Sequence, residues 1–243
     1  MASGSGYTDY RNNVIYNWGY QNLYGGEKFQ QGNDKFNFSE FNIVANYYKA
    51  GPATEPGEVS DRIANPGFRS EADFGRWYVA ENVVEGNAQG SADTWNGGVQ
   101  TKISIEKIKR DKAWPSLAMD QQTAEEAYKL VLQNAGTILP DRDVIDTRII
   151  KETRTGTATY EGKSYKEEHQ VADPNLVCGI IDTLKDVGGW PELKSDPAPK
   201  DSDHDGMPDK WEDKKGLDKQ TPEDRNQVAG DGYTMLETYL NGI

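Results

Sequence analysis

Three short segments near the start of the chain repeat one pattern: an asparagine, two β-branched residues and a second asparagine. They lie at residues 13–17, 42–46 and 82–87. Their starts are 29 and 40 residues apart, which is too far for the two strands of a hairpin. Short β-branched strands that recur at such distances predict the coils of a parallel β-helix, in which each coil stacks on the previous one.

The asparagines of this repeat are expected at the corners of the coils. Asn tolerates the left-handed backbone conformation of tight turns, and its amide groups can form hydrogen-bonded ladders along a stack. We therefore predict that Asn13, Asn42 and Asn82 occupy related corners. The alternative is a generic β-rich domain with asparagines in its turns. Antiparallel hairpins in this region would contradict the prediction of stacked coils.

From Thr123 onwards the apolar period changes from two residues to nearly four, which predicts helices. The first helix is expected to begin at a capping box, residues 123–126, and to end at Gly136, with Leu130 on its apolar face. A second helix is expected to be capped by Asp141 or Asp143 and to end before residue 156. Both helices are expected to cover the open end of the β-coils.

Residues 201–212 carry oxygen-bearing side chains at the spacing of the twelve-residue calcium loop of an EF-hand. In such a loop, carboxylates at positions 1, 3 and 5, a backbone carbonyl at 7 and a bidentate Glu at 12 bind Ca²⁺, and a Gly at 6 allows the sharp turn. Asp209, at position 9, is expected to bind directly or through a water. The predicted metal ligands are therefore Asp201, Asp203, Asp205, Met207 through its carbonyl, Asp209 and Glu212. The alternative is a solvated acidic run ahead of a helix.

A second acidic stretch, residues 224–237, fits such a loop poorly. If Asp231 is placed at position 5, Thr238 falls at position 12; if Glu237 is placed at position 12, Val228 falls at position 3. We interpret this stretch as a structural turn before a short helix at about residues 233–241. Pro208 in the first loop also lacks the N–H that would bind a partner loop, so a single calcium site is predicted.

Charge and cysteine content restrict the function of the chain. Of its 243 residues, 40 are Asp or Glu and 27 are Lys or Arg, so the net charge is −13. Such a charge argues against binding to nucleic acid and to anionic membranes, which both favour basic proteins. No apolar run is long enough to suggest a membrane span. The single cysteine, Cys178, lies in an apolar run and is expected to be a buried thiol.

These features divide the chain into four expected parts. Residues 1–6 are interpreted as a leader or truncation scar, because they lack the charged start and apolar centre of a signal peptide. Residues 7–112 are expected to form the β-coils, and residues 113–192 a helical capping region. Residues 193–243 are expected to form a Pro-containing linker and the calcium-binding tail.

With these motifs in place, the chain resembles the carboxyl-terminal part of a bacterial or fungal pectate lyase of the parallel β-helix type. The resemblance covers nearly the whole chain after the leader. The segments that carry it are residues 11–18, 24–27, 46–54, 85–87, 95–98, 142–146, 201–212, 231–234 and 236–241.

The resemblance implies a mainly β fold, with right-handed parallel β-helix coils followed by capping helices and an EF-hand-like tail. It also implies a secreted, periplasmic or cell-surface protein that is a monomer and has polygalacturonate (pectate) as its partner. In this family, calcium ions bridge enzyme carboxylates to the uronate, and an arginine removes the C5 proton in a β-elimination. That arginine needs nearby cations or desolvation, because its pKa is ordinarily far above neutral.

In the family, the catalytic arginine and the active-site calcium carboxylates precede the segment that begins here at Arg11. The chain is therefore expected to lack them, and Arg11 is expected to make structural pairings only. This predicts part of a secreted pectate-lyase-like protein that keeps a calcium-binding tail. The alternative is a non-catalytic, calcium-dependent module that binds polysaccharide. A cytosolic calcium sensor is disfavoured, because sensors use paired loops.

Overall fold

The computed structural model describes residues 6–28, 37–138, 141–192 and 196–242. The chain divides into two compact units, Met1–Pro191 (unit 1) and Glu192–Ile243 (unit 2), each described by itself below. Apart from Gly6, the expected leader lies outside the described residues. The expected internal boundary of unit 1, between residues 112 and 113, stays a prediction.

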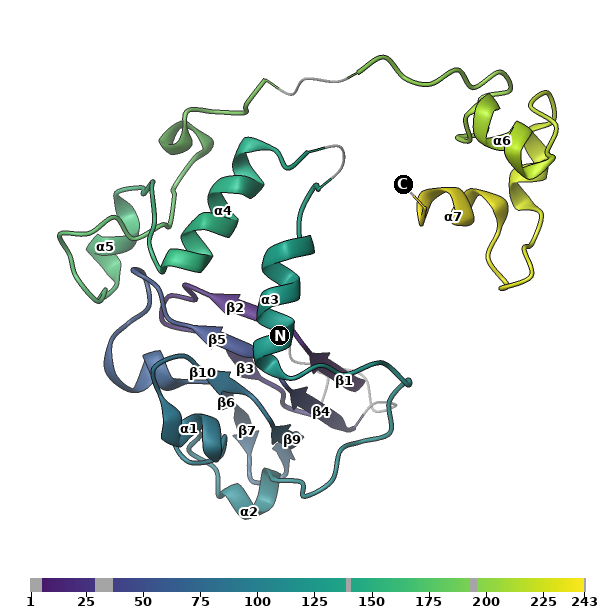
Figure 1. The fold of residues 1–243 in the computed structure, drawn as a ribbon. Coiled ribbons are helices and arrows are strands. Elements are labelled where there is room, and N and C mark those ends of the chain that lie inside the picture. The colour runs from purple at the N-terminus through teal and green to yellow at the C-terminus, as the bar shows by residue number, and fades with distance from the viewer. Residues whose placement is uncertain (1–5, 29–36, 139–140, 193–195, 243) are drawn as a thin grey trace. The chain divides into compact units, whose positions relative to one another are not determined.

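Unit 1 contains small sheets built from short strands (Figure 1). In the described part of the chain, three sheets are parallel, with strand orders β1-β4-β9, β2-β5-β10 and β3-β6, and a fourth pairs β7 with β8 in antiparallel fashion. The strands are β1 (Gly6–Arg11), β2 (Val14–Tyr16), β3 (Leu23–Gly25), β4 (Ser39–Val44), β5 (Tyr47–Lys49), β6 (Ala64–Pro66), β7 (Phe68–Ser70), β8 (Asp73–Phe74), β9 (Arg76–Ala80) and β10 (Val83–Val84).

Three equivalent corners connect the first parallel sheet to the second. Each corner lies between consecutive strands, β1 to β2, β4 to β5 and β9 to β10. The residue that turns the chain has a left-handed backbone in every case, with φ of 54° at Asn12, 51° at Ala45 and 60° at Glu81. Because the three corners share this geometry, the strands on either side stay in parallel register.

An asparagine follows the left-handed residue at each corner and forms a ladder with the next. Asn13 donates from Nδ2 to Oδ1 of Asn46 at 3.0 Å, and Asn46 donates from Nδ2 to Oδ1 of Asn82 at 2.9 Å. Nδ2 of Asn82 donates to the carbonyl oxygen of Ile43 at 2.8 Å. We call Asn13, Asn46 and Asn82 the asparagine ladder.

The prediction that Asn42 occupies the second corner was wrong, because Asn46 occupies it. Asn42 lies within β4, where its side chain accepts from the backbone N–H of Trp114 at 2.9 Å and donates to its carbonyl at 3.1 Å. The repeat of residues 42–46 has an asparagine at both ends, and the second one, Asn46, occupies the corner. Its β-branched pair therefore belongs to the strand before the corner, whereas the other two pairs follow theirs.

The core of unit 1 is built largely from side chains of these strands. The rings of Phe41 and Trp77, from adjacent strands, stack with centroids 3.9 Å apart. Ile43, Tyr48 and Ile63 are fully buried in the same cluster. Cys178, the lone cysteine, is also fully buried, as predicted, and burial raises the pKa of its thiol.

Helices occupy much of the remaining described chain. The α-helices are α1 (Ala88–Ala92), α2 (Ile105–Ile108), α3 (Ala124–Asn134), α4 (Val144–Thr155), α5 (Ser164–Glu168), α6 (Asp209–Lys215) and α7 (Met235–Leu240). The 3₁₀ helices are η1 (Gly57–Asp61), η2 (Leu184–Val187) and η3 (Pro222–Asn226).

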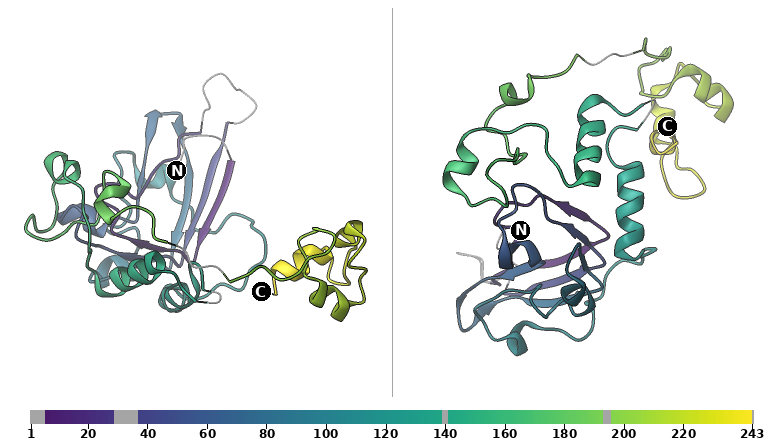
Figure 2. Two further views of the ribbon diagram at one scale, coloured as in Figure 1. Left: turned by 90° about the horizontal axis from the view of Figure 1, so that it is seen from above. Right: turned by 60° about the vertical axis from the view of Figure 1, so that its left-hand side comes forward.

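The starts of the two long helices agree with the prediction. Both hydrogen bonds of the Thr123 capping box are formed at α3, and Asp143 caps α4 by accepting from the backbone N–H of residue 146. Helix α3 packs beside β5, where the rings of Tyr128 and Tyr47 stack with centroids 4.4 Å apart. Figure 2 shows the ribbon of the chain from two further directions. Leu130 is 43% exposed, so its predicted place on the buried face was wrong; Leu132 is buried instead.

The predicted fold class was also wrong. A mainly β, right-handed parallel β-helix was expected, but the described residues form a mixture of helix and strand with no closed or solenoid sheet. The strands pair in parallel as the repeat indicated, yet each sheet holds only two or three strands of two to six residues. After residue 123, helix caps and left-handed glycines set the local structure, so the strand pattern does not continue.

Candidate metal centre in unit 2

Unit 2 is built from α6, η3 and α7 (Figure 1). Helices α6 and α7 pack through Trp211 and Tyr239, whose rings meet edge to face with centroids 5.4 Å apart. An antiparallel bridge between Val228 and Thr234 closes the turn before α7. The residues that precede α6 form the loop for which metal binding is predicted.

This loop is wound around the carboxylate of Asp201. Oδ1 of Asp201 accepts from the backbone N–H of His204 at 2.8 Å, and Oδ2 accepts from that of Gly206 at 3.0 Å. Both donors have a left-handed backbone, with φ of 60° at His204 and 97° at Gly206. A glycine at the sixth position of the loop is what this turn requires.

Five carboxylates come together here in two overlapping groups. Each residue of a group offers one oxygen within 4.8 Å of the oxygens offered by the others. Two oxygens bound to opposite sides of one Ca²⁺ would be about 5 Å apart, given Ca–O distances of roughly 2.3–2.6 Å. We call the five residues the acidic cluster; one group is Asp201, Asp203 and Asp205, and the other is Asp205, Glu212 and Asp224.

Several oxygens of the acidic cluster are buried without a hydrogen-bond partner among the described residues. They are both carboxylate oxygens of Asp203, both of Glu212, Oδ2 of Asp205 and Oδ1 of Asp224. The side chain of Glu212 has no exposed surface, and those of Asp205 and Asp224 are 2% and 4% exposed. A buried polar group without a partner costs about 1–3 kcal/mol, and more when it is charged. Hard oxygen donors in this state suit a divalent cation such as Ca²⁺.

The electrostatics of the cluster agree with crowded negative charge. Burial, and then the neighbouring carboxylates of Asp203 and Asp205, raise the pKa of Glu212 to about 7. Burial, and then the neighbouring carboxylates of Asp205 and Asp201, also raise the pKa of Asp203. A bound cation would favour the ionised forms of both residues.

Two of the six predicted ligand residues, Asp209 and Met207, are not among the five carboxylates of the acidic cluster. Asp209 accepts from Nζ of Lys200 at 2.8 Å and from the backbone N–H and hydroxyl of Ser202 at 2.8 and 2.9 Å. The ion pair with Lys200 lowers the pKa of Asp209. Met207 is fully buried. Its carbonyl stays a predicted ligand.

The second acidic stretch adds one residue that the sequence interpretation did not assign. Glu237 caps α7 by accepting from the backbone N–H of Thr234 at 2.7 Å, and Asp231 accepts from that of Tyr233 at 3.1 Å. Both have structural roles, as the interpretation as a turn before a helix predicted. Asp224 instead joins the acidic cluster. Its burial distinguishes it from Asp231 and Glu237, and the sequence did not reveal that burial.

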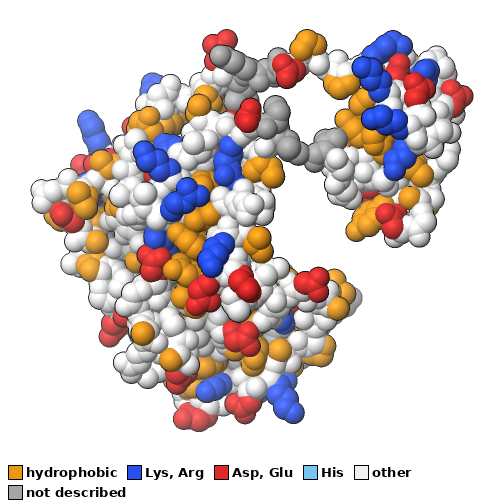
Figure 3. All heavy atoms as spheres, viewed as in Figure 1, with side chains coloured by type: hydrophobic (Ala, Val, Ile, Leu, Met, Phe, Trp, Pro, Cys, Tyr) orange, Lys and Arg blue, Asp and Glu red, His pale blue; other side chains and the backbone are white. Residues whose placement is uncertain are grey.

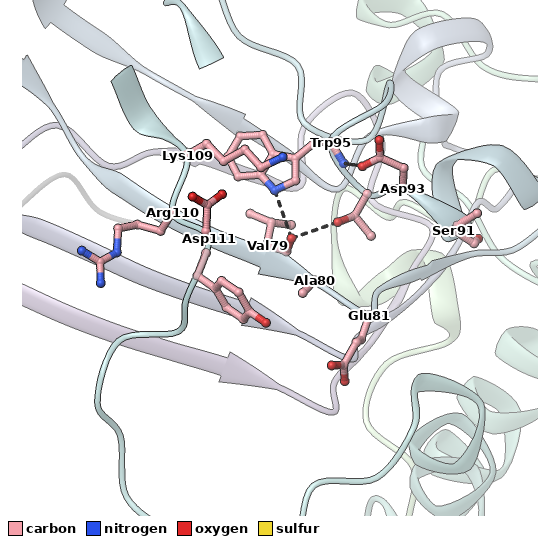
Figure 4. Close-up of a pocket in the computed structure, with 12 residues that line it drawn as sticks. Val79, Ala80, Glu81, Ser91, Asp93, Trp95, Lys109, Arg110 and Asp111 are labelled. Carbon is pink, nitrogen blue, oxygen red and sulfur yellow. Dashed lines mark hydrogen bonds between the residues drawn. The ribbon is translucent and has the colours of Figure 1, made fainter. Parts of the chain in front are cut away.

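A pocket of about 470 Å³ lies at the edge of the parallel sheets in unit 1 (Figure 4). The indole N–H of Trp95 donates to the carbonyl of Val79 at 3.1 Å, and Nζ of Lys109 lies 5.4 Å from the centre of the Trp95 ring. Trp95 is only 9% exposed, so its ring faces the core more than the pocket. Acidic residues in the lining include Glu81, Asp93 and Asp111. Lys109 and Arg110 also line the pocket, so it carries charges of both signs.

Arg11 is held by three side chains. It pairs with Asp9 in the same strand, donates from Nη1 to Oε1 of Gln121 at 2.7 Å, and donates from Nη2 to Oγ of Ser116 at 3.2 Å. These contacts fasten the segment before α3 to β1. They agree with the predicted structural role.

Charged and hydrophobic side chains share the visible surface of unit 1 (Figure 3). Acidic, basic and hydrophobic side chains are interspersed over the face of unit 1 in Figure 3. Among the described residues, no helix combines the length and hydrophobicity needed to cross a bilayer.

The fold and the acidic cluster together define a class: a protein with small parallel sheets joined to a unit that carries a cluster of buried carboxylates. No family model matches the chain. It is 30% identical over 243 residues to a protein from Aspergillus fumigatus named "Probable pectate lyase C", an alignment that covers 98% of this chain and 49% of that protein. A protein of the same name from Neosartorya fischeri gives the same identity and coverage. One from Aspergillus flavus is 26% identical over 240 residues, with 98% and 49% coverage.

These similarities extend over nearly the whole chain and support a relationship to the pectate lyase family. The chain spans about half the length of the curated relatives it matches.

Proposed function

We propose that this chain is part of a secreted pectate-lyase-type protein and that its unit 2 binds one Ca²⁺ at the acidic cluster. The observation that carries the proposal is the set of buried carboxylate oxygens without partners on Asp203, Asp205 and Glu212. Lysine or arginine side chains would satisfy such oxygens in an ordinary ion-pair network. Here Lys200 is bound to Asp209 instead, outside the cluster.

The donor set also favours calcium over softer or smaller metals. All the candidate side chains offer oxygen, which excludes the nitrogen and sulfur ligation typical of zinc. Magnesium requires a near-ideal octahedron and keeps several waters, whereas Ca²⁺ accepts six to eight oxygens in flexible geometry. A bound divalent cation would offset part of the negative charge of the cluster; the loop, α6 and the turn around Asp201 orient the ligands for it.

We propose pectate as the substrate class of the whole protein, because the curated relatives are named pectate lyases. Calcium-dependent β-elimination is the activity that this relationship supports for a full-length protein. We propose that this chain by itself has no lyase turnover, because the side chain of Arg11, the candidate base that the sequence offers, is bound to three structural partners. A base must instead reach the proton that it removes.

Calorimetric titration tests the calcium site directly. The chain, freed of metal with a chelator, is titrated with Ca²⁺ and separately with Mg²⁺. We expect one Ca²⁺ per chain and weaker Mg²⁺ binding; no heat of calcium binding at millimolar concentrations would refute the proposal. Glu212→Gln should remove most of the binding, while Glu237→Gln, which alters only the cap of α7, should leave it nearly unchanged.

A turnover assay tests the second part of the proposal. Polygalacturonate is incubated with the chain and Ca²⁺, and the unsaturated product is followed by its ultraviolet absorbance. No increase is expected from the chain alone. A robust calcium-dependent increase would contradict the assignment of Arg11 to structure. Retention on a polygalacturonate column without turnover would instead support the alternative, a non-catalytic binding module.

A further inference from the structure

The second group of the acidic cluster brings together side chains from three separate elements. Asp205 lies in the loop, Glu212 in α6 and Asp224 in η3. One oxygen of each lies within 4.8 Å of the other two, and all three residues are buried. The stretch that contains Asp224 follows the loop in sequence, outside residues 201–212.

Asp224 presents its two oxygens in different ways. Oδ2 accepts from the backbone N–H of Asp218 at 2.8 Å, which fixes the side chain against the turn before η3. Oδ1 is buried and has no partner among the described residues. Asp205 shows the same arrangement, because its Oδ1 accepts from the backbone N–H of Met207 at 2.7 Å while Oδ2 stays unpartnered. In both residues one oxygen anchors the carboxylate, and the other is buried without a partner among the described residues.

A purely structural role explains only half of this arrangement. Capping of the turn accounts for Oδ2 of Asp224 but leaves Oδ1 unexplained. The adjacent guanidinium does not account for it either, because Nη1 of Arg225 donates to the backbone carbonyl of Asp205 at 3.3 Å. An ionised carboxylate buried beside Asp205 and Glu212 requires a positive partner.

We propose that Asp224 is a direct ligand of the calcium ion, supplied from outside the twelve-residue loop in place of the ninth loop position. This inference rests on the proposed calcium site. Asp209, which occupies the ninth position, is already bound to Lys200 and Ser202. With a bidentate Glu212 and the Met207 carbonyl, four Asp side chains then complete a sphere of about seven oxygens, a number typical of Ca²⁺.

The consequence is a cation that joins two parts of unit 2. The loop and α6 contribute most of the ligands, and η3 contributes Asp224. The turn between α6 and η3 is thereby closed by the metal as well as by the hydrogen bond from Asp218. Calcium should therefore order η3 together with the loop.

Calcium titration of Asp224→Asn tests the inference. Asparagine has nearly the same shape and can still accept from Asp218, but it removes the charge. We expect the calcium dissociation constant to rise by at least about tenfold, since even residues that only support metal ligands cost roughly 10–100-fold. The matched control is Glu223→Gln, an exposed neighbour in η3, which should change the constant less than about twofold.

Terbium luminescence separates a direct ligand from a supporting residue. Lifetimes of bound Tb³⁺ in H₂O and D₂O count the coordinated waters, and Trp211, next to Glu212, can sensitise the emission. Asp224→Asn should add about one water to the ion, because Ca²⁺-type sites fill open positions with water. The count comes only from protein that holds the ion, so partial unfolding does not imitate it.

The outcomes distinguish the two proposals. If the parent chain binds no calcium, the proposed function fails. If the parent binds one ion and Asp224→Asn binds it with unchanged affinity and water count, the further inference alone fails. Two ions per parent chain would also overturn it, because Asp224 would then belong to a second site.

Discussion

Unit 1 and unit 2 both bury polar side chains close to one another, but they satisfy them in opposite ways. In the asparagine ladder, each amide donates to the next and the last donates to a backbone carbonyl, so the protein itself completes the network. In the acidic cluster, only one type of group is present, and carboxylate oxygens accept without donating. The described residues therefore supply no positive partner for the buried oxygens of the cluster.

This difference separates a structural polar network from a ligand site. A self-complementary group such as an amide can repeat along a stack without any outside partner. A set of acceptors with the same charge requires a cation, and it is costly without one. The comparison predicts that substitutions in the ladder act on stability without regard to calcium, while substitutions in the acidic cluster act through calcium.

The largest effect is expected at the centre of the ladder, Asn46. Its side chain accepts from the backbone and amide of Asn13 and donates to Tyr10 and Asn82. Asn46→Ala leaves several buried groups without partners, at about 1–3 kcal/mol each. We expect unit 1 to lose about 3 kcal/mol or more of unfolding free energy, measured by urea denaturation.

Two controls accompany this prediction. Asn96→Ala, at an exposed position, should have little effect. The loss at Asn46 should be the same with calcium and with a chelator. A small loss, or one that calcium reverses, would show that the ladder is not self-sufficient.

The next effect is the calcium-dependent stabilisation of unit 2. Binding to the folded state alone adds about 2.7 kcal/mol when free calcium is 100 times the dissociation constant. We expect the unfolding temperature of unit 2 to rise with the logarithm of free calcium once the site is filled. Differential scanning calorimetry over a series of calcium buffers measures this rise.

Two substitutions in unit 2, one inside the acidic cluster and one outside it, test where this stabilisation arises. Glu212→Gln should remove most of the shift, because it removes the predicted bidentate ligand. Glu237→Gln should keep the shift, because glutamine can still cap α7. Equal losses in the two variants would contradict a single site built on the acidic cluster.

A change of sign is expected at Asp203, where both oxygens lack partners. Its pKa is raised by burial and by Asp205, so the ionised side chain is disfavoured without a cation. Asp203→Asn should therefore raise the unfolding temperature of unit 2 in chelator and lower it in calcium. Asp231→Asn, whose oxygen only accepts from Tyr233, should shift neither value. Thermal unfolding of Asp203→Asn is measured under both conditions. A lower unfolding temperature in chelator, or an unchanged or higher one in calcium, would contradict the prediction.

The sequence predicted local signals better than long-range arrangement. Thr123 was identified as a helix cap, and Asp143 was one of two candidates for the second cap, because capping depends on residues three positions apart. Parallel pairing was also predicted, and Asn13 and Asn82 were placed at their corners. Asn42 was misplaced because residues 42–46 have an asparagine at both ends, and the sequence does not indicate which of the two lies at the corner. The β-helix prediction then extended this local repeat to a fold that the described residues do not form.

The acidic cluster shows the same limit. The loop spacing brought Asp201, Asp203, Asp205 and Glu212 to attention, because all four lie within one short segment. Asp224 is twelve residues beyond Glu212 and fits no loop register. Its place depends on how η3 folds back on α6, and that is a tertiary property. The side-chain partners of Asp209, Lys200 and Ser202, were likewise not predicted.

The smallest effect is expected at Arg11, which tests whether unit 1 contains a base or only structure. Its side chain is 13% exposed and binds Asp9, Gln121 and Ser116. Arg11→Ala should lower the unfolding free energy of unit 1 by about 1 kcal/mol, the usual size for a partly exposed polar network. Arg11→Lys should recover part of this loss, because an ammonium can pair with Asp9 but cannot span all three partners. Neither variant should alter the product absorbance from polygalacturonate, since the parent is expected to have no turnover. If the parent showed a calcium-dependent rate and both variants abolished it, Arg11 would be the base.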